Sequence, residues 1–155
     1  MFIYEQKKQL YRDYCTELNL YRDDFISESQ ADNMSDYYIN SDNVKWINIF
    51  CDKDLAGFLI IGKKIPDRDE NADYTIAEAY IAPEYRRQGL MRKAVLDYMG
   101  RHSGIWSLSV LKRNSYAIRY WWDLLLEEHL NPEHSWYTED NETLMNILWK
   151  KEETA

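Results

Sequence analysis

Residues 79–91, AYIAPEYRRQGLM, decide the fold. An apolar run ends at Pro83, as expected for a strand that stops there. From Leu90 to Met99 apolar residues recur every three or four positions, which predicts an amphipathic helix. The turn at 86–89 therefore joins a strand to a helix N-terminus, where unpaired backbone N–H groups and the helix dipole favour an anion. Gly89 lets the backbone approach a ligand without a Cβ in the way. We expect a phosphate-bearing ligand at this turn, with a plain surface turn as the alternative.

The pattern on both sides of this turn predicts one α/β domain, residues 1–155, with a mixed sheet. Period-2 patterns and short apolar runs predict strands at 44–50, 55–63, 74–82, 105–111, 136–138 and 143–149. Helical spacing predicts helices over 10–21, part of 23–38, 90–99, and from Asn114 or Ser115 to the break at Asn131-Pro132. We find no internal repeat and no linker.

The composition excludes several classes of protein. Apolar residues make up 45% and charged residues 30%, as in soluble globular proteins. The five glycines form neither a dinucleotide-binding nor a P-loop fingerprint. No HExxH is present and the three histidines lack zinc-ligand spacing, so we expect no metal site. With two cysteines, no signal-peptide core and no apolar run long enough for a bilayer, we expect a cytoplasmic protein without a membrane partner.

Charge is unevenly distributed along the chain. Residues 86–119 hold eight basic side chains and one acid, a charge of +7. Because the net charge of the chain is −8, the other 121 residues together carry −15. The segregation supports an anion near the basic turn. The strongly acidic remainder argues against a nucleic-acid partner, although a local DNA-binding patch is a weaker alternative.

Residues 79–91 resemble the acetyl-CoA motif of the GNAT superfamily of N-acetyltransferases, [RQ]-x-x-G-x-[GA] after a strand and a proline; Arg86 and Gly89 match. Residues 114–120, NSYAIRY, resemble a later motif of that family, N-x-x-A-x-x followed by an apolar or aromatic residue. The resemblance covers about 44–126, the motif-bearing core, and the first 43 residues match nothing specific. It implies the acyl-CoA N-acyltransferase fold, a mixed, mostly antiparallel central sheet flanked by helices. It also implies acetyl-CoA as the acetyl donor.

The resemblance further implies how the donor lies. In this family the strand ending at Pro83 and the next strand splay apart, and the pantetheine arm of CoA enters the gap. The backbone of Ile81 would bond this arm, amides of the turn would hold the pyrophosphate, and Asn114 would reach CoA through its side chain or serve as a helix cap. Met91 departs from the usual Gly or Ala. The implied cofactor-binding residues are Ile81, Arg86, Arg87, Gln88, Gly89, Leu90, Met91, Arg92 and Asn114.

The implied reaction is direct attack of an amine on the thioester. Glu78, an acid in an otherwise apolar strand, is the candidate general base; a cross-strand partner for a lysine or a solvent-facing position is the alternative. Tyr80 is a candidate for orienting substrate or water. Trp121 stands where the family often has a tyrosine general acid, and an indole cannot give up its proton. Either the neighbouring Tyr120 or water would protonate the thiolate.

The resemblance implies as acceptor a primary amine on a small molecule or peptide. The acidic body would attract a cationic substrate of this kind, such as a polyamine, an aminoglycoside or a lysine side chain. An acidic loop could border the acceptor cleft or simply be solvated; it contains Asp67, Asp69, Glu70 and Asp73. Aromatic candidates for the same pocket, most of them expected in the core, are Tyr4, Tyr11, Tyr37, Tyr38 and Trp46. A non-catalytic CoA-binding sensor or partner-binding module is the second hypothesis, because Trp121 replaces the usual acid. The sequence does not decide whether the chain forms a homodimer.

Overall fold

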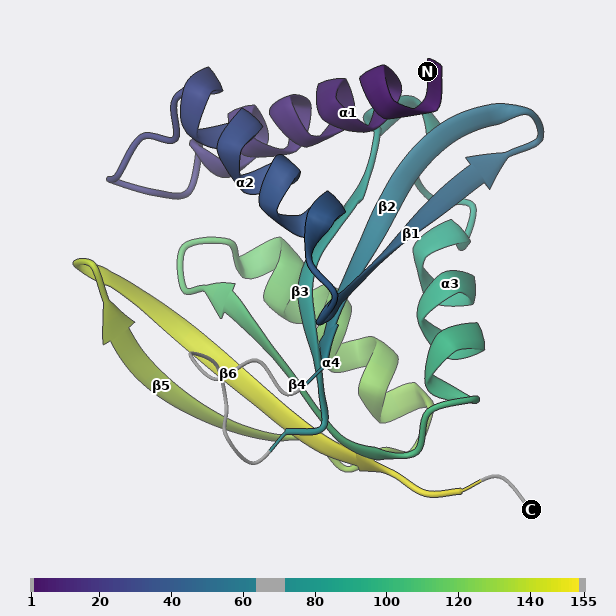
Figure 1. Ribbon diagram of the computed structural model, residues 1–155. Helices are drawn as coiled ribbons and strands as arrows, with labels where there is room; N and C mark the ends of the chain where they lie inside the picture. The colour runs from purple at the N-terminus through teal and green to yellow at the C-terminus, as the bar shows by residue number, and fades with distance from the viewer. Residues whose placement is uncertain (1, 64–71, 154–155) are drawn as a thin grey trace.

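A single mixed sheet with helices on both faces forms the framework (Figure 1). The computed structural model describes residues 2–63 and 72–153. Within them the strand order is β1-β2-β3-β4-β6-β5, and only β3 and β4 run parallel. The strands are β1 (Val44–Cys51), β2 (Asp54–Lys63), β3 (Tyr74–Ile81), β4 (Gly104–Leu111), β5 (Glu133–Glu139) and β6 (Glu142–Lys151). The helices are α1 (Phe2–Leu18), α2 (Glu28–Asn40), the 3₁₀ turn η1 (Pro83–Tyr85), α3 (Leu90–Met99) and α4 (Ser115–Glu127).

This architecture confirms the expected mixed, mostly antiparallel sheet flanked by helices. The differences lie mainly at element ends. The helix expected over 10–21 ends at Leu18, because the Asn19 side chain bonds Ile26 through both its oxygen (2.8 Å) and its nitrogen (3.0 Å) and turns the chain back. The second helix begins after Ser27, whose side chain and that of Gln30 form a capping box. No helix in the described residues is long and apolar enough to cross a membrane.

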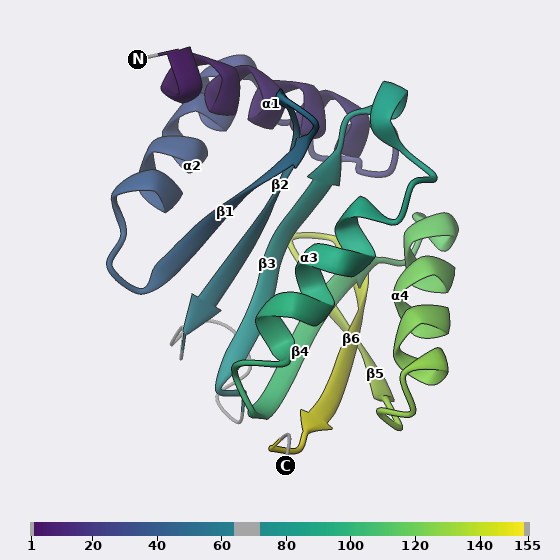
Figure 2. The ribbon, with the colours of Figure 1, turned by 90° about the vertical axis from the view of Figure 1, so that its right-hand side faces the viewer.

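The sheet separates two hydrophobic clusters, and β2 is buried on both faces. Phe58 and Ile60 pack into the cluster beneath α1 and α2, whereas Leu59 and Ile61 pack into the larger cluster beneath α3 and α4. This alternation is the period-2 geometry of a strand. Figure 2 shows α3 and α4 together on one face, with α1 and α2 on the other.

The parallel pair β3–β4 is closed at one end and open at the other. Pairing runs only from Tyr74 to Ile76, after which the strands separate. At the closed end, the backbone N–H of Asp73 donates to the Ile105 carbonyl (2.7 Å), and the N–H of Ile105 donates to the Asp73 carboxylate (2.9 Å). The splay implied by the family resemblance is therefore present.

A β-bulge lies in β3 where the splay begins. Ile60 of β2 is opposite Glu78, but the next residue, Ile61, is opposite Ile76, so Ala77 is an extra residue in β3. Such bulges re-aim side chains and are common beside active sites. Here the bulge places Glu78 on the α2 side of the sheet, where it contacts Tyr38.

Candidate active site

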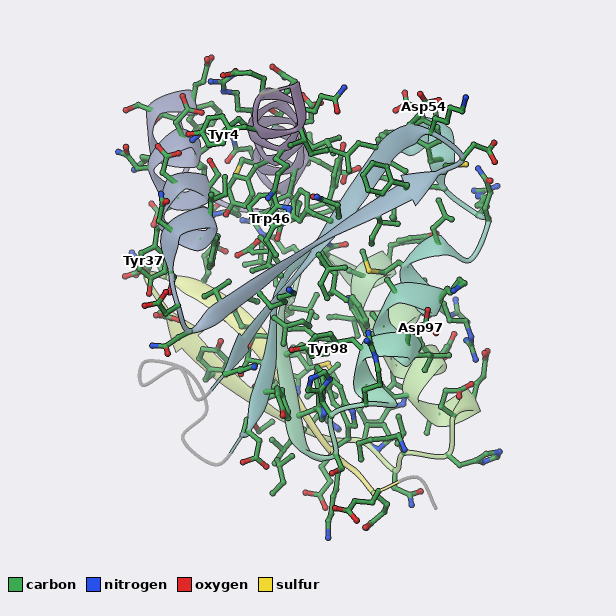
Figure 3. All side chains as sticks on the ribbon, turned by 45° about the vertical axis from the view of Figure 1, so that its right-hand side comes forward. Tyr4, Tyr37, Trp46, Asp54, Asp97 and Tyr98 are labelled. Carbon is green, nitrogen blue, oxygen red and sulfur yellow. The ribbon has the colours of Figure 1, made fainter. Side chains whose placement is uncertain are left out.

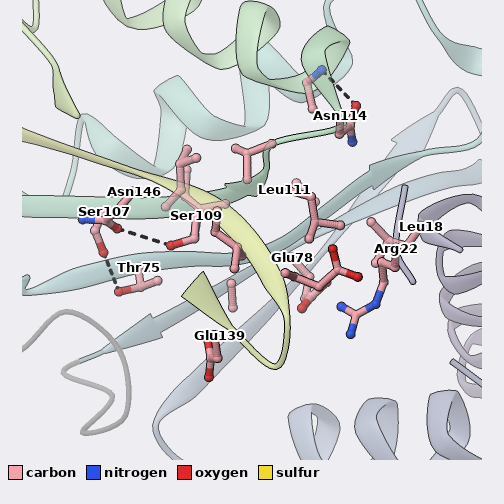
Figure 4. A pocket seen from close by; sticks show the side chains of 18 of the residues that line it. Leu18, Arg22, Thr75, Glu78, Ser107, Ser109, Leu111, Asn114, Glu139 and Asn146 are labelled. Carbon is pink, nitrogen blue, oxygen red and sulfur yellow. Dashed lines mark hydrogen bonds between the residues drawn. The ribbon is translucent and has the colours of Figure 1, made fainter. Parts of the chain in front are cut away.

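A cleft of about 640 Å³ opens where β3 and β4 separate (Figure 4). One wall comes from α1, α2 and the loop between them, and the opposite wall from β5 and β6. The start of α4 also contributes, through Asn114, Ala117 and Trp121. Because Trp121 belongs to the cluster under α3 and α4 while Tyr38 belongs to the cluster under α1 and α2, the cleft reaches from one face of the sheet to the other.

Glu78 is the candidate catalytic residue that lies in this cleft. The Tyr38 hydroxyl donates to its carboxylate at 3.4 Å. The pKa of Tyr14 is raised well above its usual value, first by burial and then by the negative charge of Glu78. The pKa of the Cys15 thiol is raised to about 12, first by burial and then by Glu78, whereas the positive charge of Arg22 lowers it. A carboxylate that faces a cleft can accept a proton from a ligand bound there.

Two other candidate catalytic residues, Tyr80 and Tyr120, are not among the residues that line the cleft. Tyr80 packs 5.9 Å from the Phe58 ring, with the guanidinium of Arg86 5.5 Å from its own ring, and burial raises the pKa of Tyr80 to about 12. Burial also raises the pKa of Tyr120. The neighbouring Trp121 is 8% exposed and lines the cleft instead.

The turn before α3 has the backbone geometry of an anion cradle. Gly89, the N-cap, has φ +75°, and a Cβ built on it would meet nothing within 4 Å. Arg87 also has a positive φ, +65°. The backbone N–H groups of residues 87–92 find no acceptor among the described residues, as the first N–H groups of a helix often do not. Figure 2 shows that α3 and α4 both begin at the end of the sheet where β3 and β4 separate.

Two of the candidate arginines bind carboxylates of the protein. Arg86 donates to the Ile81 carbonyl (2.7 Å) and to Glu17 of α1 (2.8 Å). Arg92 bridges the end of α4 through Glu127 (2.8 Å) and Glu128 (2.7 Å). The charge segregation in the sequence is thus partly balanced in space. Arg87 is exposed and has no ion-pair partner among the described residues, so it is the arginine of the turn that is available to an anion.

The remaining candidate cofactor residues lie around the same turn and splay. The Ala82 N–H donates to the carbonyl of Ala56 in β2, so the backbone of the alternate residue Ile81 faces the gap. Asn114 caps α4 through its side-chain oxygen (3.2 Å to the Ala117 N–H) and lines the cleft, leaving its NH₂ group to donate. Gln88 is exposed and accepts from the Cys51 thiol at 3.6 Å.

Met91, the departure from the family motif, does not occupy the turn. Its side chain is 8% exposed and packs in the cluster under α3 and α4. Leu90 is partly buried against the same cluster. Both residues therefore contribute backbone to the turn while their side chains pack inward.

Sequence reasoning missed several polar groups of the cleft. The Tyr137 hydroxyl donates to Ser109 (2.9 Å), which bonds Asn146 (3.3 Å). Asn146 leaves a signal in the sequence, an amide within the apolar strand β6. Arg22 leaves none, because it lies in the irregular loop between α1 and α2.

Only some of the aromatic and acidic residues that the sequence suggested for the acceptor pocket line the cleft. Of the aromatic candidates, Tyr38 lines the cleft, whereas Tyr11 and Trp46 belong to the cluster under α1 and α2. Tyr4 and Tyr37 are exposed on those helices (Figure 3). Asp73 holds the closed end of the splay; the other three acids, Asp67, Asp69 and Glu70, lie outside the described residues. Within the described ranges, no group of three His, Cys, Asp or Glu side chains could hold a metal ion.

Glu142 fastens the α1–α2 loop to the far wall of the cleft. Its carboxylate accepts from the Asp23 backbone N–H (2.5 Å), and Arg113 pairs with both Glu142 (3.4 Å) and Asp23 (3.2 Å). The pKa of Glu142 is lowered from its ordinary 4.5, first by the Asp23 N–H and also by the charge of Arg113. The folded protein therefore favours the ionised form of Glu142, which stabilises the fold at neutral pH. This stabilisation is lost as the pH falls below 4.5 and the carboxylate becomes protonated.

We expect Glu142→Gln to lower the melting temperature at pH 7, because the amide loses the charge that pairs with Arg113. The difference from wild type should shrink as the pH falls below 4.5, where the wild-type carboxyl becomes protonated. Thermal unfolding at both pH values measures this. Glu139→Gln, an exposed site on the same hairpin, is the control. If the melting temperatures of wild type and Glu142→Gln differed by the same amount at pH 7 and below pH 4.5, the ionised Glu142 carboxylate would not be the stabilising group.

Comparison with known proteins adds independent findings. The model of the acetyltransferase (GNAT) family matches residues 9–124 and so extends into α1, where the sequence alone matched nothing specific. No curated protein is similar enough in sequence to count as a relative.

Solved structures share the fold. An acetyltransferase from Thermus thermophilus has a TM-score of 0.65 at 12% identity, covering 91% of this chain and 86% of that one. YncA from Salmonella typhimurium, solved with acetyl-CoA, has a TM-score of 0.59 at 13% identity, covering 96% and 88%. The diaminobutyrate acetyltransferase EctA from Paenibacillus lautus, solved with L-2,4-diaminobutyric acid and coenzyme A, has a TM-score of 0.60 at 16% identity, covering 94% and 90%.

Proposed function

Because the chain belongs to the GNAT family of acetyltransferases, we propose that it transfers an acetyl group from acetyl-CoA to a primary amine of a small molecule or peptide. The observation that carries the proposal is the position of Glu78: a carboxylate on a bulge, at the opening between β3 and β4, inside a cleft that reaches both faces of the sheet. We place this activity in the cytoplasm.

The donor would bind from the α3 side. The turn supplies unpaired N–H groups and a helix N-terminus for the pyrophosphate, and Arg87 adds a positive charge. The pantetheine arm would enter the splay beside the backbone of Ile81 and the NH₂ group of Asn114. Arg86 and Arg92 would hold the turn against α1 and α4 through their carboxylate partners. The backbone positions that take part are those of Arg86, Arg87, Gln88, Gly89, Leu90, Met91 and Arg92.

The acceptor would arrive from the α1–α2 side. An alkyl ammonium with a pKa of about 10.4 is mostly protonated at pH 7, so one proton must leave before attack. Glu78 takes that proton, directly or through a water. The free nitrogen then attacks the thioester carbonyl carbon, and a backbone N–H near Ile81 stabilises the oxyanion. The C–S bond breaks, the nitrogen loses its second proton, and the products are an acetamide and coenzyme A, whose thiolate takes up a proton.

The CoA thiolate needs little help in leaving, because a thiol with a pKa of about 8.5, the value of a cysteine, gives a stable anion. We therefore favour water as its proton source, with Tyr120 as the alternative. Tyr80 would orient substrate or water only indirectly, through the Arg86 guanidinium that stacks on its ring.

We expect Tyr120→Phe to change kcat by less than about twofold. The hydroxyl belongs to a side chain that is not among the residues lining the cleft, and its burial raises its pKa. Steady-state rates from neutral to mildly alkaline pH test this, with Tyr116→Phe, an exposed tyrosine of the same helix, as the control. A loss of about 10²-fold, the scale of a lost general acid, would make Tyr120 the proton donor.

The activity is tested by incubating the protein with acetyl-CoA and a panel of primary amines, following both thiol release and acetylated product. Thiol release that depends on the amine supports the proposal. Tight CoA binding without transfer to any amine would favour the second candidate, a CoA-binding sensor.

A further inference from the structure

Arg22 is the one basic side chain among the described residues that line the cleft. It lies in the loop between α1 and α2, half-buried, and its Nε donates to the Asp24 carbonyl at 3.0 Å. No carboxylate among the described residues lies within 4.0 Å of its guanidinium, whereas five other arginines have one within that distance: Arg12, Arg86, Arg92, Arg113 and Arg119. Arg22 therefore brings an unmatched positive charge to a cleft whose other charged lining residues are acidic.

Arg22 and Glu78 face the same part of the cleft. Figure 4 shows both side chains among those that line the pocket. The charges of both also act on the same buried thiol, that of Cys15 in α1. The cleft thus presents an acceptor for an ammonium proton and, separately, a donor for an anion.

We propose that the acceptor is a small amine that also carries a carboxylate, such as a diamino acid. Its carboxylate pairs with the Arg22 guanidinium, whose planar N–H groups suit a carboxylate well, while its reacting amine is directed to Glu78. This inference rests on the proposed acetyl transfer and narrows its substrate class to free molecules, because the α-carboxyl group of an internal lysine is part of a peptide bond and carries no charge. A site with an unpaired guanidinium discriminates against an analogue that lacks the anion.

The experiment compares amines that differ only in the anion: L-ornithine with putrescine, and L-lysine with lysinamide and cadaverine. We expect the wild type to acetylate the amino acids with a kcat/KM at least about tenfold above their carboxylate-free counterparts. In Arg22→Gln, KM for the amino acids should rise about 10- to 100-fold with little change in kcat, and the diamines should be unaffected or improved. Arg22→Lys, which keeps the charge but not the planar fork, should fall between the two.

Two controls separate this role from a structural one. Arg101→Gln removes an exposed arginine of similar bonding, whose Nε also donates to a backbone carbonyl (Asp97, 3.2 Å), outside the cleft lining. It should leave all rates unchanged. CoA affinity and melting temperature of Arg22→Gln should match the wild type, because Arg22 lies on the acceptor side. Arg22→Lys keeps the test valid if the glutamine variant is unstable.

The outcomes are distinguishable. A wild type that acetylates diamines and diamino acids equally, or a preference that survives Arg22→Gln, overturns the carboxylate site and leaves the acetyltransferase intact. A preference for amines carrying a phosphate over those carrying a carboxylate also overturns it. A wild type that binds CoA but acetylates no amine overturns the proposed function itself.

Discussion

Replacing Gly89 by valine will weaken CoA binding by about 100-fold or more and leave the fold largely intact. Gly89 has φ +75°, so a β-branched residue there is strained by an amount on the order of 1–2 kcal/mol. No atom of the protein lies within 4 Å of the added Cβ, so the side chain causes no internal clash. It would instead project into the open space beside the unpaired N–H groups of the turn, where the proposed pyrophosphate lies. Calorimetric titration with CoA and thermal unfolding measure the two effects separately.

Two further variants isolate the cause. Asparagine tolerates a left-handed backbone, so Gly89→Asn should lose less stability than the valine variant and still bind CoA poorly because of its side chain. Gly100→Ala changes the glycine at the other end of the same helix, where φ is −63°, and should leave CoA affinity unchanged. Unaltered CoA affinity in Gly89→Val would remove the turn from the binding site.

Glu78→Gln will lower kcat by about 10²- to 10³-fold, the scale of a lost general base, and leave the Kd for CoA unchanged. Glutamine has nearly the same shape and keeps an oxygen that can accept from Tyr38, but it cannot take a proton from the ammonium. The deficit should shrink as the pH approaches ~10, where the amine loses its proton to solvent. Initial rates across pH and CoA titrations measure both parameters.

The matched control is Glu139→Gln, which removes an exposed carboxylate from the β5 wall of the same cleft. It should reduce kcat by less than about threefold, far below the scale of a lost base. If Glu78→Gln kept the wild-type rate, the acceptor amine would have to lose its proton elsewhere, and Glu78 would be a structural partner of Tyr38.

The parts of the site that could be predicted are those that local sequence determines. The strand, the basic turn and the helix of residues 79–99 lie in succession, so proline, glycine and helical spacing mark them. Asn114 is marked as a helix cap for the same reason. Glu78 stands out because an acid interrupts an apolar strand. In each case the signal and the structure lie within a few residues of one another.

The parts that could not be predicted depend on contacts between residues that are far apart in the sequence. The bulge at Ala77 is a matter of register between β2 and β3, which neither strand specifies alone. The basic segment looks unbalanced in the sequence because its carboxylate partners lie elsewhere in the chain: Arg86 binds Glu17, 69 positions away. Arg22 carries no local pattern, and only the approach of its loop to β3 places it in the cleft.

The division of the core by the sheet has a consequence for how such enzymes diversify. Tyr38 and Arg22 come from the α1–α2 side, whereas the turn at Gly89 is built over the opposite cluster. Substitutions in α1, α2 and their connecting loop can therefore change what is acetylated without repacking the layer that supports the donor. New specificities can arise on one side while the donor-binding turn is inherited unchanged on the other.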